Sequence, residues 1–266
     1  MPRLDSELIT RNIATSRERA KELIKGGFIT VNGKTASKPA MNVEETDDII
    51  SSAETFRYVG RGGLKLEKAV KEFNLSLNGK VCVDIGASTG GFTDCMLQNG
   101  AEYVYAVDVG HDQLDEKLRN DNRVFNAENS DIRNIDIDFF QHEIDFISID
   151  VSFISVTKVL PKAFEILKNG GEASVLIKPQ FEAGKASIGK KGIVKDKKAH
   201  LRVLKEIYDF VILLGFNPLG LSGSGIKGGS GNTEYLIYLK KETPVGNSFD
   251  FKKIVDSAFA ETDERK

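Results

Sequence analysis

Apolar and polar residues follow two alternating patterns between about residue 80 and residue 240. Short apolar runs indicate strands, and the segments between them carry apolar residues at helical spacing. This alternation predicts an α/β fold with a doubly wound, Rossmann-like sheet. The seven predicted strands are 81–85, 103–108, 123–127, 145–150, 172–178, 216–221 and 234–240. The predicted helices include 92–99, 113–119, 155–168 and 197–214.

Only the turn-rich segment GSGIKGGSGNT separates the last two predicted strands. So short a connection predicts an antiparallel hairpin at the edge of the sheet, since a parallel neighbour would need a longer crossover. Residues 59–242 are therefore expected to form one domain. Residues 243–266 show no comparable pattern and are expected to form a polar extension, partly disordered.

Residues 1–58 are expected to form a separate, small α+β domain. Residues 15–25 begin with a Ser/Thr cap and place Leu23 and Ile24 on one face of a helix. Two glycines end that helix. Two short β-type runs follow, joined by an Asn-Gly dipeptide at position 32, which is the preferred sequence of a type I′ hairpin turn.

Charge is distributed unevenly, although the net charge of the 266 residues is only −2. Residues 11–40 hold seven Lys or Arg and two Glu, and residues 178–205 hold nine Lys or Arg and two acids. Residues 41–54, by contrast, hold five acids and no base. Two basic surfaces on a near-neutral protein suit a polyanion bound at two places. Charge alone fits two solvated faces equally well.

Residue usage disfavours several classes of protein. Cys82 and Cys95 are too few for a disulfide framework and indicate a reducing compartment. The three histidines have no second ligand at metal-binding spacing, so no metal site is predicted. The N-terminal segment is too polar for a signal peptide, and no apolar run reaches the roughly 20 residues of a membrane span. A soluble, cytoplasmic protein is expected.

The segment VCVDIGASTGGFTD, residues 81–94, predicts a cofactor-binding loop between a strand and a helix. Its glycine spacing, G-x-x-x-G-G, differs from the dinucleotide fingerprint G-x-G-x-x-G. Asp84 precedes the first glycine and would repel a pyrophosphate, but it suits the ammonium and sulfonium groups of S-adenosylmethionine. Asp108 ends the next strand 24 residues later, where an acid commonly receives ribose hydroxyls. Asp131 follows a third strand, where an adenine amino group could be read.

These features together predict an S-adenosylmethionine site in the methyltransferase variant of the Rossmann fold. The alternative is that the glycines serve only a tight turn. The residues predicted to bind the cofactor are Asp84, Gly86, Ala87, Ser88, Gly90, Gly91, Phe92, Asp108, Val109, Asp131, Ile132 and Asp150.

Methylation of an alcohol needs a group that deprotonates the hydroxyl or stabilises the alkoxide, and a positioned lysine can do this. Candidates lie at strand ends, where open α/β sheets bind ligands. Asp150 and Lys178 end two predicted strands, and Glu234 begins the last one. Lys65 precedes the first strand on a predicted helix. Taken singly, Lys65, Asp150 and Glu234 could be surface or capping residues, whereas Lys178 follows the apolar run of a buried strand.

The segment SRERAKELIKGGFITVNGKTASKPAMNVEETDDI resembles the alpha-L RNA-binding module, first described in a ribosomal protein. The resemblance implies that the first domain contacts RNA through phosphates and shape. The alternative is an ordinary helix-hairpin fragment. Residues expected to bind RNA are Arg3, Arg11, Ser16, Arg17, Arg19, Lys21, Lys25, Lys34 and Lys38, with Lys185, Lys190 and Lys191 of the second basic segment.

The blocks YVGRGGLKL, DIGASTGGFTD, DVGHDQL, IDVSFIS, LIKPQFE and GNTEYL resemble the TlyA (haemolysin A) family. In that family an alpha-L module precedes an FtsJ-like domain, and members methylate cytidine 2′-hydroxyls of ribosomal RNA. The resemblance implies a catalytic tetrad of Lys65, Asp150, Lys178 and Glu234, with Lys178 at the 2′-oxygen. The chain departs from the pattern at Tyr58, where some members have Trp. That difference leaves open any coupling between the domains and cofactor binding.

Residues 182–195 are rich in glycine and lysine and would border the tetrad. One interpretation is a mobile loop that closes over RNA, and the other is a solubilising loop.

Four functions can be compared on these features. A ribosomal RNA 2′-O-methyltransferase, acting on free RNA or on ribosomal subunits, fits every motif. A membrane-active haemolysin is disfavoured because the sequence has no membrane span and no long basic amphipathic helix with aromatics. A non-catalytic RNA-binding or ribosome-assembly protein would not need the cofactor acids or the tetrad. A small-molecule methyltransferase would not need the RNA module.

Overall fold

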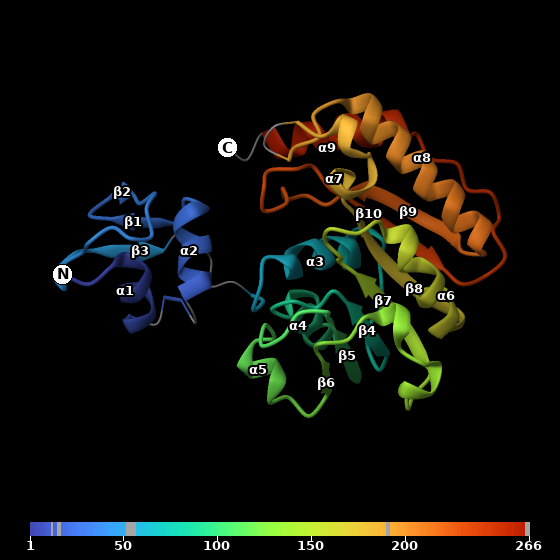
Figure 1. Cartoon of the computed structure of the whole chain (residues 1–266), viewed down its shortest axis with the longest axis horizontal. Helices are drawn as coiled ribbons and strands as arrows, with labels where there is room; N and C mark the ends of the chain where they lie inside the picture. The colour runs from blue at the N-terminus through green and yellow to red at the C-terminus, as the bar shows by residue number, and fades with distance from the viewer. Residues whose placement is uncertain (12, 15–16, 52–56, 190–191, 264–266) are drawn as a thin grey trace. The chain divides into compact units, whose positions relative to one another are not determined.

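The computed structural model describes residues 1–266 except 12, 15–16, 52–56, 190–191 and 264–266. The chain divides into two compact units, Met1–Arg57 and Tyr58–Lys266 (Figure 1). Each unit has hydrophobic core clusters of its own.

The first unit combines two helices with a three-stranded antiparallel sheet of order β2-β1-β3. Its elements are α1 (Leu4–Thr10), α2 (Arg17–Lys25), β1 (Ile29–Val31), β2 (Lys34–Thr35) and β3 (Ile49–Ser51). Asn32 and Gly33 join β1 to β2 with φ angles of 50° and 75°, as a type I′ turn requires. The predicted helix and hairpin are confirmed, and α1 is an additional element.

The second unit is built on a seven-stranded sheet of order β6-β5-β4-β7-β8-β10-β9. Its strands are β4 (Val81–Ile85), β5 (Tyr103–Val107), β6 (Val124–Ala127), β7 (Ile144–Ile149), β8 (Leu167–Ile177), β9 (Asn217–Gly223) and β10 (Tyr235–Lys240). β10 runs antiparallel to both of its neighbours, β8 and β9, so the predicted α/β class and the antiparallel edge hairpin are confirmed. The strand order reverses between β4 and β7, and ligands of open α/β sheets bind at such a reversal.

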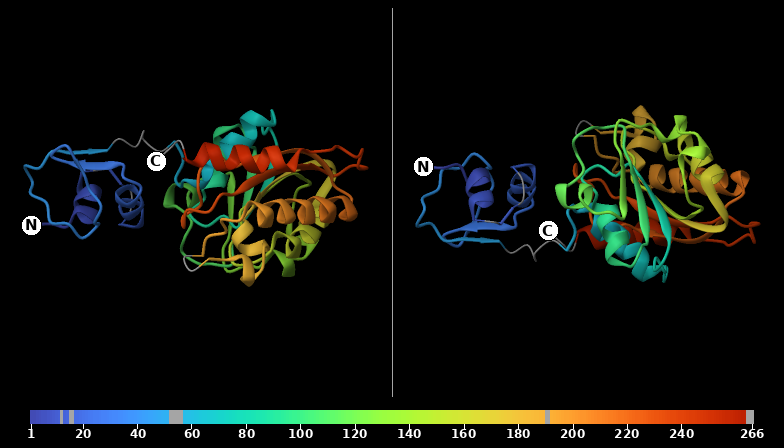
Figure 2. Two further views of the ribbon diagram at one scale, coloured as in Figure 1. Left: turned by 90° about the horizontal axis from the view of Figure 1, so that it is seen from above. Right: turned by 90° about the horizontal axis from the view of Figure 1, so that it is seen from below.

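Helices cover both faces of this sheet (Figure 2). They are α3 (Gly62–Glu72), α4 (Gly91–Gln98), α5 (Glu116–Arg119), α6 (Leu160–Ile166), α7 (Pro179–Glu182), α8 (Lys197–Leu214) and α9 (Phe251–Asp263). Side chains alternate along each strand, so the sheet has two separate cores. Val83 and Ile85 face the core that includes α6 and α8, and Cys82 faces the core that includes α3 and α4.

The C-terminal segment differs from its prediction as a polar, partly disordered extension. Residues Phe251–Asp263 form α9, which packs against α8 and β9. Val255 and Ala258 are buried in the core, and Asp256 pairs with Lys197 at 2.6 Å. Three partly buried apolar side chains, Phe251, Ile254 and Phe259, pack against the same core and complete the apolar face that docks this helix.

Two predicted helices are shorter in the structure. The segment 113–119 contributes only α5, which begins after Asp115 caps its first turn. The segment 155–168 contains a 3₁₀ turn, Val156–Lys158, followed by α6, and its last residues already belong to β8. Pro161 lies in the first turn of α6, where the missing N–H costs nothing, and so favours a new helix start there.

Candidate active site

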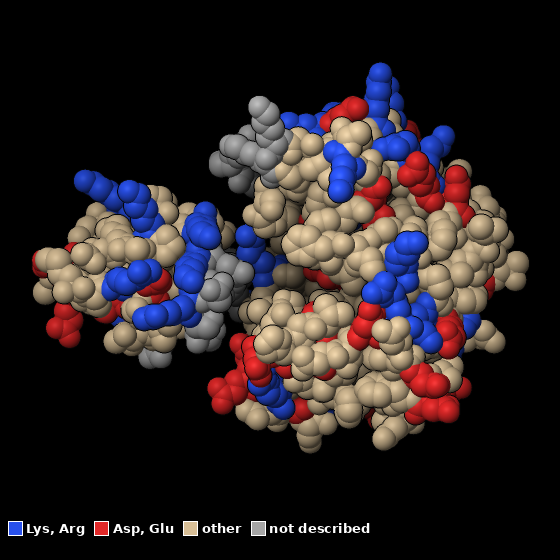
Figure 3. Space-filling view, in the orientation of Figure 1, with Lys and Arg blue, Asp and Glu red and all other residues tan. Residues whose placement is uncertain are grey.

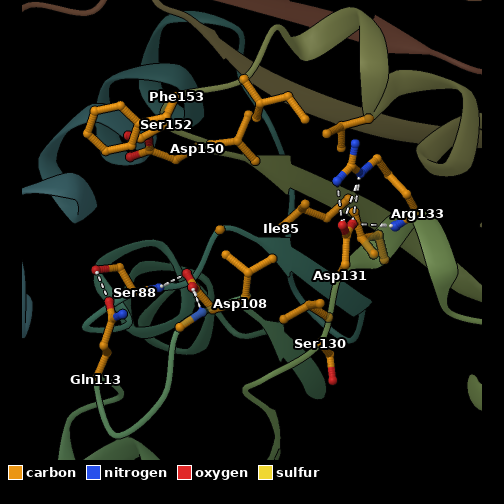
Figure 4. Close-up of a pocket in the computed structure, with 18 residues that line it drawn as sticks. Ile85, Ser88, Asp108, Gln113, Ser130, Asp131, Arg133, Asp150, Ser152 and Phe153 are labelled. Carbon is orange, nitrogen blue, oxygen red and sulfur yellow. Dashed lines mark hydrogen bonds and ion pairs between the residues drawn. The ribbon is translucent and has the colours of Figure 1, made fainter.

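A pocket of about 680 Å³ lies at the carboxyl ends of β4, β5 and β7, where the strand order reverses (Figure 4). Residues from the three loops that follow these strands line it. Those loops supply Gly86 and Ser88, then Asp108, Val109, Gly110 and Gln113, and then Asp150, Val151, Ser152 and Phe153. Ser130, Asp131, Ile132 and Arg133 close a further side.

Asp108 is the best-oriented carboxylate of the pocket. Its Oδ2 accepts the backbone N–H of Ser88 at 2.8 Å, and its Oδ1 accepts that of Gly110 at 2.7 Å (Figure 4). Each carboxylate oxygen can accept a further hydrogen bond. The group is therefore held in place while it keeps the capacity to receive the two hydroxyls of a ribose.

Gly86 brings the backbone of the first loop close to the end of β7. Its φ is +87°, and a Cβ at this position would lie 2.5 Å from the carbonyl oxygen of Asp150. A side chain here would be strained and would also clash, so glycine is required. This close approach leaves room for a ligand beside the loop.

Four other predicted cofactor residues of this loop do not line the pocket: Ala87, Gly90, Gly91 and Phe92. A Cβ on Gly90 would lie 2.2 Å from Leu118 Cδ1, and one on Gly91 would lie 2.9 Å from the Gly63 nitrogen. These two glycines therefore allow α4 to pack closely against α5 and the start of α3. Their position favours a structural role over the predicted cofactor contact.

Asp84 also lies away from the pocket, in contrast to the prediction of a direct cofactor contact. Its side chain is fully buried, and its two carboxylate oxygens accept the hydroxyls of Thr93 at 2.7 Å and Ser148 at 2.9 Å. Burial raises the pKa of Asp84 to about 7, and the two hydroxyls partly oppose this shift. Alternation along β4 turns Asp84 toward α4, whereas Ile85 faces the pocket.

Asp131 lines the pocket with a fixed orientation. It forms a forked ion pair with Arg133, with a shortest N–O distance of 2.5 Å (Figure 4). This guanidinium lowers the pKa of the Asp131 carboxyl, which stays ionised. An ionised acid here can accept an exocyclic amino group, as predicted for adenine recognition, but it shares its oxygens with Arg133.

The four residues of the predicted tetrad form two ion pairs. Lys178 Nζ lies 2.6 Å from Asp150 Oδ1, and Lys65 Nζ lies 2.6 Å from Glu234 Oε2. Tyr235 of β10 pairs with Ile177 of β8. Glu234, which precedes Tyr235, and Lys178, which follows Ile177, are therefore neighbours where β10 begins and β8 ends. The antiparallel direction of β10 allows the start of this strand to meet the end of β8.

Two polar residues that the sequence analysis did not predict complete these pairs. Ser152 accepts a hydrogen bond from Lys178 Nζ at 2.8 Å, and Gln180 donates to Glu234 Oε1 at 3.0 Å. Both follow tetrad residues by two positions in the chain. A polar residue two positions after a tetrad residue at a strand end is the sequence feature that could have identified them.

Basic side chains of the first unit gather over β1, β2 and α2 in the view of Figure 3. Arg17, Lys25, Lys34 and Lys38 are exposed, and Lys21 is half-buried. Among the remaining predicted RNA contacts, Ser16, Lys190 and Lys191 lie outside the described residues, as does the side chain of Arg19. Lys185 is exposed, at the start of a 3₁₀ turn in the second unit.

Arg3 and Arg11 are less available than their charge suggested. Arg3 forms a two-bond fork with Asp5, with a shortest distance of 2.6 Å. Arg11 donates to Glu7 at 2.8 Å and to the backbone oxygens of Asp47, Glu44 and Glu45. The Arg11 guanidinium thus holds the loop before β3 and is a structural residue of this unit.

Among the described residues, no helix is long and apolar enough to cross a membrane. No group of three or more metal-ligating side chains occurs in the same part of the chain.

The strand order and the pocket at its reversal define a Rossmann-type methyltransferase, and comparison with known proteins narrows the class. The model of the FtsJ-like methyltransferase family matches residues 58–241, and that of the S4 domain matches residues 2–49.

Three relatives agree with these matches. "Putative rRNA methyltransferase YqxC" of Bacillus subtilis is 48% identical over 89% of this chain and 85% of its own length. "16S/23S rRNA (cytidine-2'-O)-methyltransferase TlyA" of Mycobacterium tuberculosis is 38% identical over 91% of this chain and 90% of its own. A solved structure, "Putative hemolysin from Streptococcus thermophilus", is 43% identical and has a TM-score of 0.80, covering 98% of this chain and 96% of that one. The chain belongs to the TlyA family of FtsJ-like methyltransferases.

Proposed function

We propose that this protein transfers a methyl group from S-adenosylmethionine to a ribose 2′-hydroxyl of ribosomal RNA, at a cytidine. The printed names of the relatives support the substrate, and a ribosomal substrate agrees with action in the cytoplasm. The observation that carries the proposal is the Lys178 ammonium, which Asp150 and Ser152 hold beside the pocket.

The residues of the pocket fit the proposed cofactor. Asp108 would receive the ribose hydroxyls, Asp131 would accept the adenine amino group, and the backbone at Gly86 would allow close approach. When bound, S-adenosylmethionine supplies an electrophilic methyl group. Since Asp150 and Ser152 both line the pocket and both contact Lys178, the lysine lies next to the place where methyl transfer would occur.

Lys178 would act on the attacking oxygen of the RNA. An ammonium group has three N–H donors, and the contacts with Asp150 and Ser152 leave one for a substrate oxygen. A fixed cation at this position stabilises the negative charge that develops on the 2′-oxygen while the hydroxyl proton passes to water. Asp150 orients the ammonium, and Lys65 with Glu234 fixes the neighbouring wall.

The first unit would recruit the RNA through its exposed cations. Arg17, Lys25, Lys34 and Lys38 are exposed, whereas Arg3 is held by Asp5, and Arg11 by Glu7 and three backbone carbonyls. Contacts of lysine and arginine with phosphates release counterions, so this binding is expected to weaken steeply as salt rises.

The direct test is methyl transfer from labelled cofactor to ribosomal subunits or to free ribosomal RNA. The wild-type protein is expected to transfer label to ribose. The variant Lys178→Met should lose this activity, and the variant Lys71→Met should retain it. Lys71 is the matched control because it is an exposed lysine of α3 paired only with Glu67 among the described contacts. Cofactor binding without transfer to any ribosomal substrate would overturn the proposal.

A further inference from the structure

Asn232 is a buried polar residue next to the tetrad that the mechanism above does not use. It lies two positions before Glu234, and only 1% of its surface is exposed. Its Oδ1 accepts the backbone N–H of Val194 at 3.0 Å, and its Nδ2 donates to the carbonyl of Gly192 at 2.9 Å. One side-chain amide thus satisfies two backbone groups of the lysine-rich segment.

His200 of α8 holds the same segment from another direction. His200 Nε2 lies 2.9 Å from the carbonyl oxygen of Val194, and a carbonyl can only accept, so Nε2 carries the proton. Burial lowers the pKa of His200, which favours the neutral ring. Nδ1 of that ring accepts the hydroxyl of Tyr235 at 2.8 Å. Tyr235 follows Glu234 directly in the chain.

Both backbone polar groups of Val194 are therefore linked to residues close to Glu234 in the chain. Asn232 binds the N–H group directly, and Tyr235 is linked to the carbonyl group through His200. At its other end the segment is held by Arg202, which donates to the carbonyl of Ala183 at 2.8 Å. These contacts argue against the interpretation of residues 182–195 as a loop that moves freely, because its described ends are fixed to α8 and β10.

We propose that Asn232 is a positioning residue that fixes the lysine-rich segment to the start of β10. The placement of Glu234 and the RNA contacts of the segment then depend on one buried amide. The proposal rests on the proposed function, and it takes the lysine-rich segment to contact the RNA, as its sequence predicts. It predicts that loss of the amide weakens RNA binding and slows catalysis, while cofactor affinity is unchanged because Asn232 does not line the pocket.

The test compares Asn232→Ala with Asn217→Ala. Asn217 is equally buried, donates to Glu242 at 2.9 Å and accepts the backbone N–H of Val245, but it lies at the opposite end of the sheet. Removal of two buried hydrogen bonds in Asn232→Ala is expected to raise the KM for RNA about tenfold and to speed hydrogen exchange at the Val194 amide by at least about tenfold. Asn217→Ala is expected to change neither quantity. The dissociation constant of S-adenosylmethionine should stay within about twofold of the wild-type value in both variants.

Asn232→Ser provides a graded control in case the alanine variant does not fold. Its hydroxyl can bond one of the two backbone groups that Asn232 holds, so an intermediate KM and exchange rate are expected. Faster exchange with an unchanged KM, or equal effects of the two alanine variants, would overturn the inference. If the wild-type protein itself methylates no RNA, the proposed function fails instead. The exchange measurement needs no RNA and still shows whether Asn232 fixes the segment.

Discussion

The two ion pairs of the site have similar lengths and different surroundings. Asp150 and Ser152 line the pocket, and the side chain of Asp150 is 19% exposed. Glu234 and Lys65 do not line it, and the side chain of Glu234 is 2% exposed. Gln180 occupies the second oxygen of Glu234, whereas Ser152 contacts the lysine of the other pair.

This difference indicates that the two ion pairs of the tetrad have different roles. The pair Lys178–Asp150 can touch a substrate, because it borders an open pocket. The pair Lys65–Glu234 is enclosed and acts on the reaction through the position of its neighbours. A buried ion pair contributes little net stability but is costly to break, since the remaining charge is left unpaired. The enclosed pair should therefore matter more for folding, and the open pair more for catalysis.

The largest expected effect concerns kcat. Lys178→Met should lower kcat by about 1,000-fold, because the group that stabilises the charged oxygen is lost. Lys65→Met should lower kcat by only about 10- to 100-fold, the size found for groups that orient a catalytic residue. Single-turnover methylation of ribosomal RNA measures both values. Equal losses in the two variants would contradict the separation of roles.

Stability should show the opposite order. Glu234→Gln leaves the Lys65 ammonium buried without its counter-charge and should lower the free energy of unfolding by about 3 kcal/mol. Asp150→Asn should cost less, about 1 kcal/mol, because the Asp150 side chain is 19% exposed and water can solvate part of it. Urea denaturation at pH 7 compares the two variants. A larger loss in Asp150→Asn would show that exposure does not decide the cost.

A further expected effect, on the pH dependence of stability, concerns Asp84, which is coupled to the open pair. The pKa of Asp84 is about 7 in the folded protein, above its usual value, so the folded state binds more protons between about pH 4 and pH 7. Stability from this group is then full below pH 4 and is lost as pH rises to 7. Asp84→Asn should remove that part of the pH dependence. Unfolding free energies measured from pH 4 to pH 8 provide the test.

The negative charge of Asp150 contributes to the raised pKa of Asp84. Asp150→Asn should therefore move the upper limit of this window to lower pH, whereas Glu234→Gln should leave it in place. A shift in both variants, or in neither, would contradict the assignment of the coupling to Asp150.

The fold could be predicted from the sequence because strand and helix periodicity is strong between residues 80 and 240. Asp108 and Asp150 were placed near one another by the rule that carboxyl ends of parallel strands meet at one edge. The orientation of Asp84 depends on the alternation of side chains along a strand. Asp84 is the fourth residue of a five-residue strand, so its side chain faces opposite to Ile85, and this parity was overlooked.

Other features depend on contacts between distant segments. Ser152 and Gln180 were missed because their partners depend on side-chain direction after a strand ends. Arg11 was expected at an RNA surface because the local sequence does not reveal its partners. Its three backbone acceptors lie more than 30 residues away in the chain. The helix α9 was missed because charged and polar residues separate its apolar positions, although Phe251, Ile254, Val255, Ala258 and Phe259 recur at helical spacing.

The position of β10 between β8 and β9 has a consequence for synthesis of the chain. Every pocket-lining residue lies between Ile85 and Val159, so that part of the site is complete early. Glu234 arrives only with β10, which must insert between two strands that precede it in the sequence. Contacts this distant in sequence form late in folding. A nascent chain therefore contains every residue that lines the pocket before it contains Glu234, and the pair Lys65–Glu234 is the last part of the site to be synthesised.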